Sequence, residues 1–190
     1  QNNVLNLSNL TIESGGTLTH EPNTNSTLYV LNITANFVTI RDGGLINVTG
    51  RGYAGGIDEK NGSGPGKGLV NCESGESRGG GGAGYGGIGG NSQSNGASVA
   101  IGGTSYGSIT QPLELGSGGG AGVTASCAND NNGDGGSGGG SIFINVSNII
   151  NITGNITAGG GNGTCTNYGG GGGSGGSIFI IANTFTGNGS

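Results

Sequence analysis

Apolar and polar residues alternate along the first fifty positions with the two-residue period of a β-strand that buries one face. Leu31 and Ile33 alternate with Asn32 and Thr34, and the same order recurs through 45–49. Helix formers such as Met, Lys, Glu and Arg are scarce, and no stretch has a helical period. The pattern therefore predicts an all-β fold. The expected strands, separated by Gly or Asn turns, are 4–7, 10–12, 17–19, 28–34, 37–40 and 45–48.

Glycine dominates the chain from about residue 51 to residue 140. Isolated apolar residues, among them Tyr53, Ile88 and Leu115, interrupt the glycine runs, which is unusual for a flexible linker. We expect one continuous domain with three regions. These are an N-terminal β-strand region over 1–50, a glycine-rich region over 51–140, and repeat β-strands over 141–190.

Two similar segments follow each other in the C-terminal third of the chain. Gly-Gly-Gly-Ser-Ile-Phe-Ile at 138–144 recurs as Gly-Ser-Gly-Gly-Ser-Ile-Phe-Ile at 173–180, displaced by 36 residues. Residues 45–50, Leu-Ile-Asn-Val-Thr-Gly, resemble the second half of the same unit. A unit of this size cannot bury its apolar face alone, so we expect copies to stack as turns of a short parallel β-solenoid, β-helix-like, which the repeat strands close.

The glycine runs have a structural interpretation of their own. Polyglycine can form an extended helix with three residues per turn, polyglycine II, whose backbone N–H and C=O groups point sideways. Because no Cβ keeps such strands apart, they can hydrogen-bond to one another. Each bond contributes about 1 kcal/mol, while ordering each glycine costs about 1–2 kcal/mol. We therefore expect packed polyglycine II strands that lean on the solenoid.

Composition excludes several classes of protein. Glycine supplies 51 of the 190 residues, yet it does not recur at every third position and only three prolines are present, so the chain is not a collagen helix. The net charge is −5, and the five Lys and Arg residues are scattered singly. This distribution argues against nucleic-acid binding. The apolar runs are too short to cross a bilayer.

Asn-X-Ser/Thr sequons are the strongest functional signal. Eleven of the 24 asparagines begin one, against roughly 4.5 expected by chance, and the middle residue is never proline. Asn and Thr are also common on the turns and outward faces of solenoids, which accounts for part of the excess. We predict N-glycosylation, and hence a secreted or cell-surface protein. The predicted sites are Asn6, Asn9, Asn25, Asn32, Asn47, Asn61, Asn145, Asn151, Asn155, Asn162 and Asn188.

The first residue, Gln1, fits a chain whose signal peptide has been removed, although a trimmed chain would look the same. The three cysteines lie in glycine-rich loops, and an oxidising compartment favours a disulfide. Cys127 and Cys165 lie 14 and 12 residues before the serines of their Ser-Ile-Phe-Ile strands, so stacking is expected to pair them. Cys72 is then the odd cysteine, either free or paired with another chain.

Candidate metal ligands are few. A zinc site would need CxxC or His spacing, and the single histidine, His20, is remote from the cysteines. Residues 129–135, Asn-Asp-Asn-Asn-Gly-Asp-Gly, look like a calcium loop but lack the full spaced set of acidic ligands, so a turn is the commoner meaning. We expect no metal site and no cofactor, with N-linked glycans as the attached groups and calcium at 129–135 as the alternative.

Catalytic residues are not predicted, and we expect the protein not to be an enzyme. Parallel β-helices host polysaccharide lyases and hydrolases, which use clustered carboxylates and basic residues on one face. Here the corresponding strands carry Asn and Thr, and Asp58-Glu59-Lys60 is interpreted as a solvated loop. The glycine runs lack the Gly-Lys-Ser/Thr of a phosphate-binding loop.

The run Gly-Gly-Gly-Gly-Ala-Gly-Tyr-Gly-Gly-Ile-Gly-Gly at 79–90, together with the Gly-Gly-Ser-Ile-Phe-Ile strands, resembles glycine-rich β-helix modules of large cell-surface proteins. It is also similar in style to polyglycine-II-containing surface proteins, among them phage tail-fibre tip adhesins and glycosylated filament subunits such as flagellar hairs. The resemblance covers about residues 40–190. It is architectural and carries no catalytic residues over.

We therefore expect a structural protomer of an extracellular, heavily N-glycosylated fibre or surface coat, a homopolymer that assembles head to tail. The last repeat stops at 186–190 where its predecessor continues, so the strands at 4–12 of a neighbouring copy could complete the open edge. The alternative is a cell-surface adhesin or carbohydrate-binding module in which tyrosines stack on sugars. Its candidate residues are Tyr53, Tyr85, Tyr106 and Tyr168, which could instead fill gaps over the glycine segments.

Overall fold

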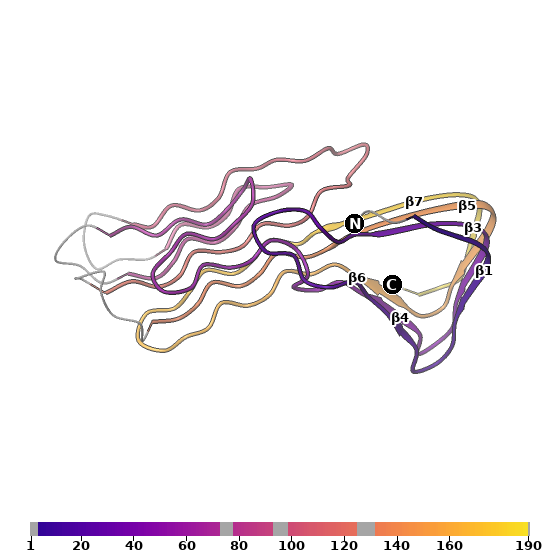
Figure 1. Ribbon diagram of the computed structural model, residues 1–190, viewed down its shortest axis with the longest axis horizontal. Coiled ribbons are helices and arrows are strands. Elements are labelled where there is room, and N and C mark those ends of the chain that lie inside the picture. Colours follow the sequence, from indigo (N-terminus) through magenta and orange to yellow (C-terminus); the bar gives the residue numbers. More distant parts are fainter. Residues whose placement is uncertain (1–3, 73–77, 93–98, 125–131, 190) are drawn as a thin grey trace.

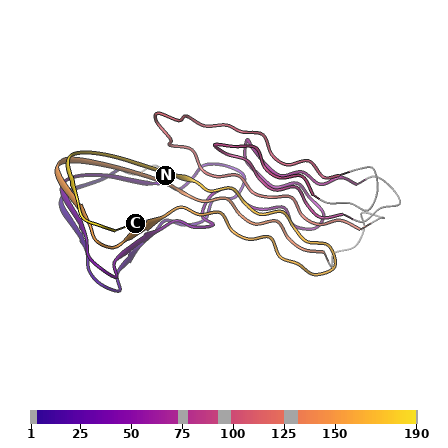
Figure 2. The same ribbon diagram turned by 180° about the vertical axis from the view of Figure 1, so that it is seen from behind.

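The computed structural model describes residues 4–72, 78–92, 99–124 and 132–189. The molecule is elongated, with β-strands at one end and glycine-rich extended segments at the other (Figure 1). Seen from behind, the glycine-rich segments run side by side along the long axis (Figure 2). No helix occurs among the described residues, and the predicted all-β class is confirmed.

In the described part of the chain, seven strands form two sheets whose neighbouring strands all run parallel. The larger sheet has the order β1-β3-β5-β7, and the smaller sheet has the order β2-β4-β6. Strands β1, β3 and β5 each lead directly into a strand of the smaller sheet. The strands are β1 Val4–Ile12, β2 Thr17–Leu18, β3 Leu31–Ile40, β4 Leu45–Asn47, β5 Ser141–Ile152, β6 Asn155–Thr157 and β7 Ser177–Thr186.

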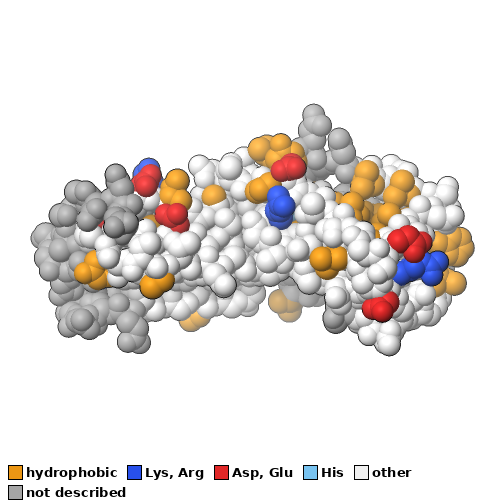
Figure 3. All heavy atoms as spheres, turned by 90° about the horizontal axis from the view of Figure 1, so that it is seen from below, with side chains coloured by type: hydrophobic (Ala, Val, Ile, Leu, Met, Phe, Trp, Pro, Cys, Tyr) orange, Lys and Arg blue, Asp and Glu red, His pale blue; other side chains and the backbone are white. Residues whose placement is uncertain are grey.

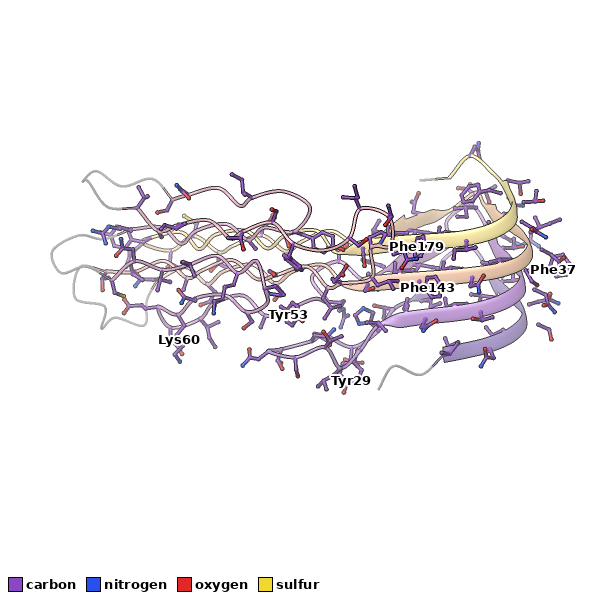
Figure 4. The ribbon with its side chains drawn as sticks, turned by 90° about the horizontal axis from the view of Figure 1, so that it is seen from above. Tyr29, Phe37, Tyr53, Lys60, Phe143 and Phe179 are labelled. Carbon is purple, nitrogen blue, oxygen red and sulfur yellow. The ribbon has the colours of Figure 1, made fainter. Side chains whose placement is uncertain are left out.

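The sequence repeat determines how β5 and β7 pair. Ser141 lies beside Ser177, which matches the 36-residue displacement, and the following residues keep that register as far as Val146. The rings of Phe143 and Phe179 consequently lie on neighbouring strands with their centroids 5.5 Å apart (Figure 4). Aromatic pairs at such separations stabilise a sheet beyond the area that they bury.

The core lies between the two sheets. Alternation selects its members: Ile33 is fully buried, whereas its strand neighbours Asn32 and Thr34 are half-buried. Burying each of these aliphatic side chains stabilises the fold by about 1.5–3 kcal/mol. The cluster consists of Ile12, Leu31, Ile33, Ala35, Val38, Ile40, Ile46, Val48, Ile142, Ile144, Val146, Ile150, Ile152 and Ile156.

Strand β5 carries one residue more than its neighbours at the bend of the larger sheet. Ala35 pairs with Val146, but Phe37 pairs with Ile149, so Asn36 faces two residues of β5. A bulge of this kind bends the strand locally. Phe37 lies at this bend and points away from the core (Figure 4). The strands expected at 4–7 and 10–12 are thus one continuous strand, β1, and those expected at 28–34 and 37–40 are one strand, β3, which begins only at Leu31; both bend at a polar residue.

The glycine-rich segments hydrogen-bond to one another with a period of three residues. From 118 to 123, successive N–H groups donate in rotation to three other segments at 2.8–3.0 Å. A three-residue period distinguishes these segments from β-strands, whose groups alternate with a period of two. The bonds run from Gly118 to Ser63, Gly119 to Gly136, Gly120 to Gly81, Ala121 to Lys60, Gly122 to Gly133 and Val123 to Arg78.

Residues 115–123 form the buried centre of the glycine-rich part. The backbone hydrogen bonds of 116–123 reach six stretches of the chain, 53–56, 60–63, 66–69, 78–81, 133–139 and 171–174. A Cβ placed on Gly118, Gly119 or Gly120 would overlap a carbonyl group of one of these neighbours. Glycine is therefore required here because the backbones approach so closely.

Candidate functional site

The two outer strands of the larger sheet, β1 and β7, carry exposed apolar side chains. Leu5 on β1 is 41% exposed, and Phe185 on β7 is 61% exposed. Both align with fully buried core residues on the inner strands, since Leu5 pairs with Ile33 and Phe185 pairs with Ile150. Their exposure follows from their place at the sheet edges, because an inner strand is covered from both sides.

An edge strand also presents backbone N–H and C=O groups in the geometry that a further strand would use. Residues that pair across the strands form columns, and the columns that contain core residues extend to both edge strands. One such column contains Leu5, Ile33, Ile144 and Ile180 in order. At the bend, a polar column contains Ser8 opposite Asn36. The inward-facing positions of the two edges are therefore apolar on both sides of a polar residue at the bend, Ser8 on β1 and Asn183 on β7.

The asparagines of the predicted glycosylation sites are all exposed or partly exposed. In the described residues none of the eleven sequon asparagines is buried. Asn6, Asn9, Asn25, Asn61, Asn155, Asn162 and Asn188 are exposed, and Asn32, Asn47, Asn145 and Asn151 are half-buried. An asparagine must be accessible to carry a sugar. The exposure of these side chains is therefore compatible with glycosylation at every predicted site, which stays a prediction.

Several sequon side chains are held through their carbonyl oxygens. Asn61 Oδ1 accepts a hydrogen bond from the Val70 N–H at 2.7 Å, and Asn25 Oδ1 accepts one from Ser63 Oγ at 2.7 Å. Asn47 Oδ1 accepts from Thr157 Oγ1 at 3.0 Å. A bond through Oδ1 fixes the side chain and is compatible with a sugar on Nδ2.

Tyr106 is built into the glycine-rich part. Its hydroxyl group donates to the Leu115 carbonyl and accepts a hydrogen bond from Ser117 Oγ at 2.8 Å. Burial raises the pKa of Tyr106 to about 12. The Tyr85 ring meets the Tyr106 ring edge to face, with 4.9 Å between centroids. These contacts support the interpretation that Tyr106 fills a gap between glycine segments.

The other candidate tyrosines lie further out. Tyr53 Oη is 3.0 Å from Thr27 Oγ1, and Tyr168 is 36% exposed. A hollow of about 360 Å³ is lined by Tyr85, Tyr106, Ile109 and the loop between the last two. Aromatic rings beside an open hollow can stack on a sugar, but only two of the four candidate tyrosines, Tyr85 and Tyr106, line this hollow.

Charged side chains are dispersed. On the face seen in Figure 3, Lys and Arg residues are separated by uncharged surface. Arg41 and Glu13 form an exposed ion pair with 2.9 Å between Nε and Oε2. Asp58 and Glu59 both have positive φ, 50° and 59°, which is typical of a tight turn. Within the described ranges, no three His, Cys, Asp or Glu side chains lie close enough together to hold a metal ion.

The predicted Cys127–Cys165 disulfide is wrong, because Cys165 is exposed with a free thiol. Cys72 is disulfide-bonded, and Cys127 lies outside the described residues. The prediction treated positions 14 and 12 residues before the two serines as equivalent. In the parallel glycine segments, however, the N–H of Gly133 donates to the carbonyl of Tyr168, a displacement of 35 residues. The two cysteines are 38 residues apart. Residues 129–131 of the proposed calcium loop also lie outside the described residues.

A second hollow, of about 340 Å³, lies on the larger sheet at its bend and was not predicted from the sequence. Asn6 and Asn145 line it, each with the serine of its own sequon, and Thr34 lies between them. Asn36 lines the hollow as well, and its Oδ1 accepts a hydrogen bond from Ser147 Oγ at 3.0 Å. Neighbouring sequons on separate strands are thus brought together, which only the strand pairing reveals.

No protein-family model, curated protein or solved structure matches this chain. Across the described residues, the structure has no helix with the length and apolar character to span a membrane.

Proposed function

We propose that this protein is a structural protomer of an extracellular, N-glycosylated fibre or surface coat that assembles head to tail with copies of itself. In this proposal the two parallel sheets are a short β-solenoid, and the glycine-rich part is a bundle of polyglycine II strands. The three-residue hydrogen-bond period and the six neighbours of 116–123 support the second assignment. The alternation of the two sheets along the chain supports the first.

The observation that carries the proposal is the match between the edges β7 and β1. If β1 of one copy is placed beside β7 of another, with Ile180 next to Leu5, the inward-facing positions of both strands agree. Ala182 then meets Leu7, Phe185 meets Leu10, and the polar Asn183 meets Ser8. Every inward-facing apolar position of one edge thus meets an apolar position of the other, whereas on the outward face the apolar Ile181 meets Asn6. Covering them removes exposed apolar area from water, which favours association.

A contact between two different edges is heterologous, and such a contact propagates into a filament unless its rotation closes a ring. Each added copy would offer a new β7 edge for the next one. Backbone pairing would supply affinity, while the alternating side chains would fix the register. The sequons would lie on outward strand positions and turns, so attached glycans would coat the polymer without entering the junction core.

The test is assembly of the secreted glycoprotein carrying Phe185→Lys. Phe185 is 61% exposed in one copy and would be covered in the polymer. An unpaired lysine buried at the junction costs several kcal/mol, and each 1.4 kcal/mol is about tenfold in affinity. We therefore expect the fraction sedimenting as filaments to fall at least about tenfold.

Thr184→Lys is the matched control, because Thr184 is exposed and lies on the outward column of the same strand. It should assemble like the wild type, and both variants should keep the wild-type circular dichroism. Equal assembly of the two lysine variants, or a wild type that stays monomeric at high concentration, would contradict the proposed function.

The second candidate is a cell-surface adhesin or carbohydrate-binding module. The hollow beside Tyr85, Tyr106 and Ile109 is the observation in its favour. Binding of soluble glycans that is lost in Tyr85→Ala would support it. We prefer the structural proposal, because the Tyr106 hydroxyl already has two protein partners.

A further inference from the structure

We propose that the hollow at the bend of the larger sheet binds the first sugar of the glycan on Asn145. This sugar is an N-acetylhexosamine. This inference rests on the proposed N-glycosylation and names the one sequon whose sugar packs against the protein. The hollow measures about 340 Å³, which falls within the range of small-ligand sites, about 300–1,000 Å³.

The attachment atoms identify the occupant. Asn6 pairs with Thr34, and Thr34 pairs with Asn145, so the two sequon asparagines face the hollow from strands two apart. Strands are about 4.8 Å apart, which places the two side chains about 10 Å from each other. A sugar linked to either amide starts within the hollow. No diffusing ligand has this advantage of being held in place by a covalent bond.

Asn145 is favoured over Asn6 because of its strand. It lies on β5, between β3 and β7, and is half-buried, so a sugar attached there must lie against the sheet. Asn6 lies on the edge strand β1 and is exposed, so its sugar can point away. Thr34 separates the two asparagines and keeps sugars off directly adjacent strands.

The lining suits an acetamido sugar. Asn36 supplies an amide, and Ser8 and Ser147 supply hydroxyl groups, for hydrogen bonds to ring hydroxyls and to the acetamido group. The bulge in β5 provides the room, since it sets one residue of β3 against two of β5.

The experiment is site-resolved release of glycans from the folded protein by a peptide-N-glycosidase, followed by glycopeptide mass spectrometry. We expect release at Asn145 to be at least tenfold slower than release at the exposed Asn162, and both rates to become equal after unfolding in urea. Asn36→Ala, which leaves every sequon intact, should speed release at Asn145 several-fold without changing release at Asn162. Asn183→Ala should change neither rate. Asn183 is the matched control, because it is exposed at the bend on the neighbouring strand β7 and does not line the hollow.

Equal release at Asn145 and Asn162 from the folded wild type would overturn the inference, with no variant needed. So would a glycan absent from Asn145 but present at other sequons, and the proposed glycoprotein would stand. Absence of glycans from all eleven sequons of the native material would overturn the proposed glycosylation itself.

Discussion

His20 lies where the β-strands meet the glycine-rich segments. Its Nδ1 is 2.7 Å from the Glu21 carbonyl, and its Nε2 is buried without a hydrogen-bond partner among the described residues. A Cβ on Gly140 would overlap Nε2, which shows how closely the backbone packs on the ring. Burial lowers the pKa of His20 below 6.5, and the charge of Arg51 lowers it further, although the Glu21 carbonyl opposes both.

This lowered pKa predicts how stability depends on pH. Below pH 6.5 the unfolded chain binds a proton on His20 that the folded protein excludes, so the free energy of unfolding falls as pH falls from 6.5 toward the folded-state pKa. Urea denaturation at pH 7.5 and pH 5.5 should show lower stability at pH 5.5. His20→Gln should show a smaller difference. A wild type that is equally stable at both pH values would contradict the burial of neutral His20.

At the scale of elements, the glycine-rich segments behave as strands without side chains. Their neighbours are held mainly by backbone hydrogen bonds, so which segments can lie side by side depends on where a Cβ has room. Gly171 donates to the Gly120 carbonyl at 2.8 Å, and a Cβ at this position would overlap the Gly81 carbonyl. At the next residue, Gly172, the nearest atom to a Cβ would be the Gly161 oxygen at 3.8 Å. Of these two adjacent residues, Gly171 must therefore be glycine, whereas Gly172 has room for a side-chain methyl group.

Gly171→Ala and Gly172→Ala should therefore differ sharply. Forcing a methyl group against packed backbone costs about 1–3 kcal/mol, whereas an alanine with room restricts the unfolded chain and stabilises by about 0.4–1 kcal/mol. We expect Gly171→Ala to lower the free energy of unfolding by about 2 kcal/mol and Gly172→Ala to leave it unchanged or slightly raised. Urea denaturation measures both. Equal effects would show that the segments are less closely packed than described.

The sequence predicted the elements whose side chains carry a pattern. Alternation around Ile33 gave the buried face of β3, and the displacement of the two Ser-Ile-Phe-Ile segments gave the register of β5 against β7. The bend at Asn36 was predicted as a break, because a polar residue ends an apolar run in sequence although the backbone pairing continues.

Features that depend on long-range geometry could not be predicted. Glycine runs have no side-chain pattern, so nothing in the sequence marks 115–123 as the centre. The hollow arises from one extra residue in β5, which becomes visible only when β5 is set against β3. The cysteine pairing failed because the glycine segments keep a displacement of 35 residues, as between Gly133 and Tyr168, whereas the two cysteines are 38 residues apart.

At the scale of the whole molecule, the proposed polymer gives each part a role. The larger sheet would continue from copy to copy through β7 and β1, and the polyglycine bundle would project beside it. In the column through Asn6, Thr34, Asn145 and Ile181, the next copy would again begin with Asn6. Sequon asparagines in that column would therefore recur at every second strand, about 10 Å apart.

A cryo-EM map of the native assembly at side-chain resolution tests the proposed head-to-tail fibre most directly. The proposed fibre predicts β7 of one copy hydrogen-bonded in parallel to β1 of the next, with Phe185 beside Leu10, and sugar density on outward sequon asparagines. Copies that meet through the glycine-rich segments, with the β7 edge facing solvent, would contradict the head-to-tail junction.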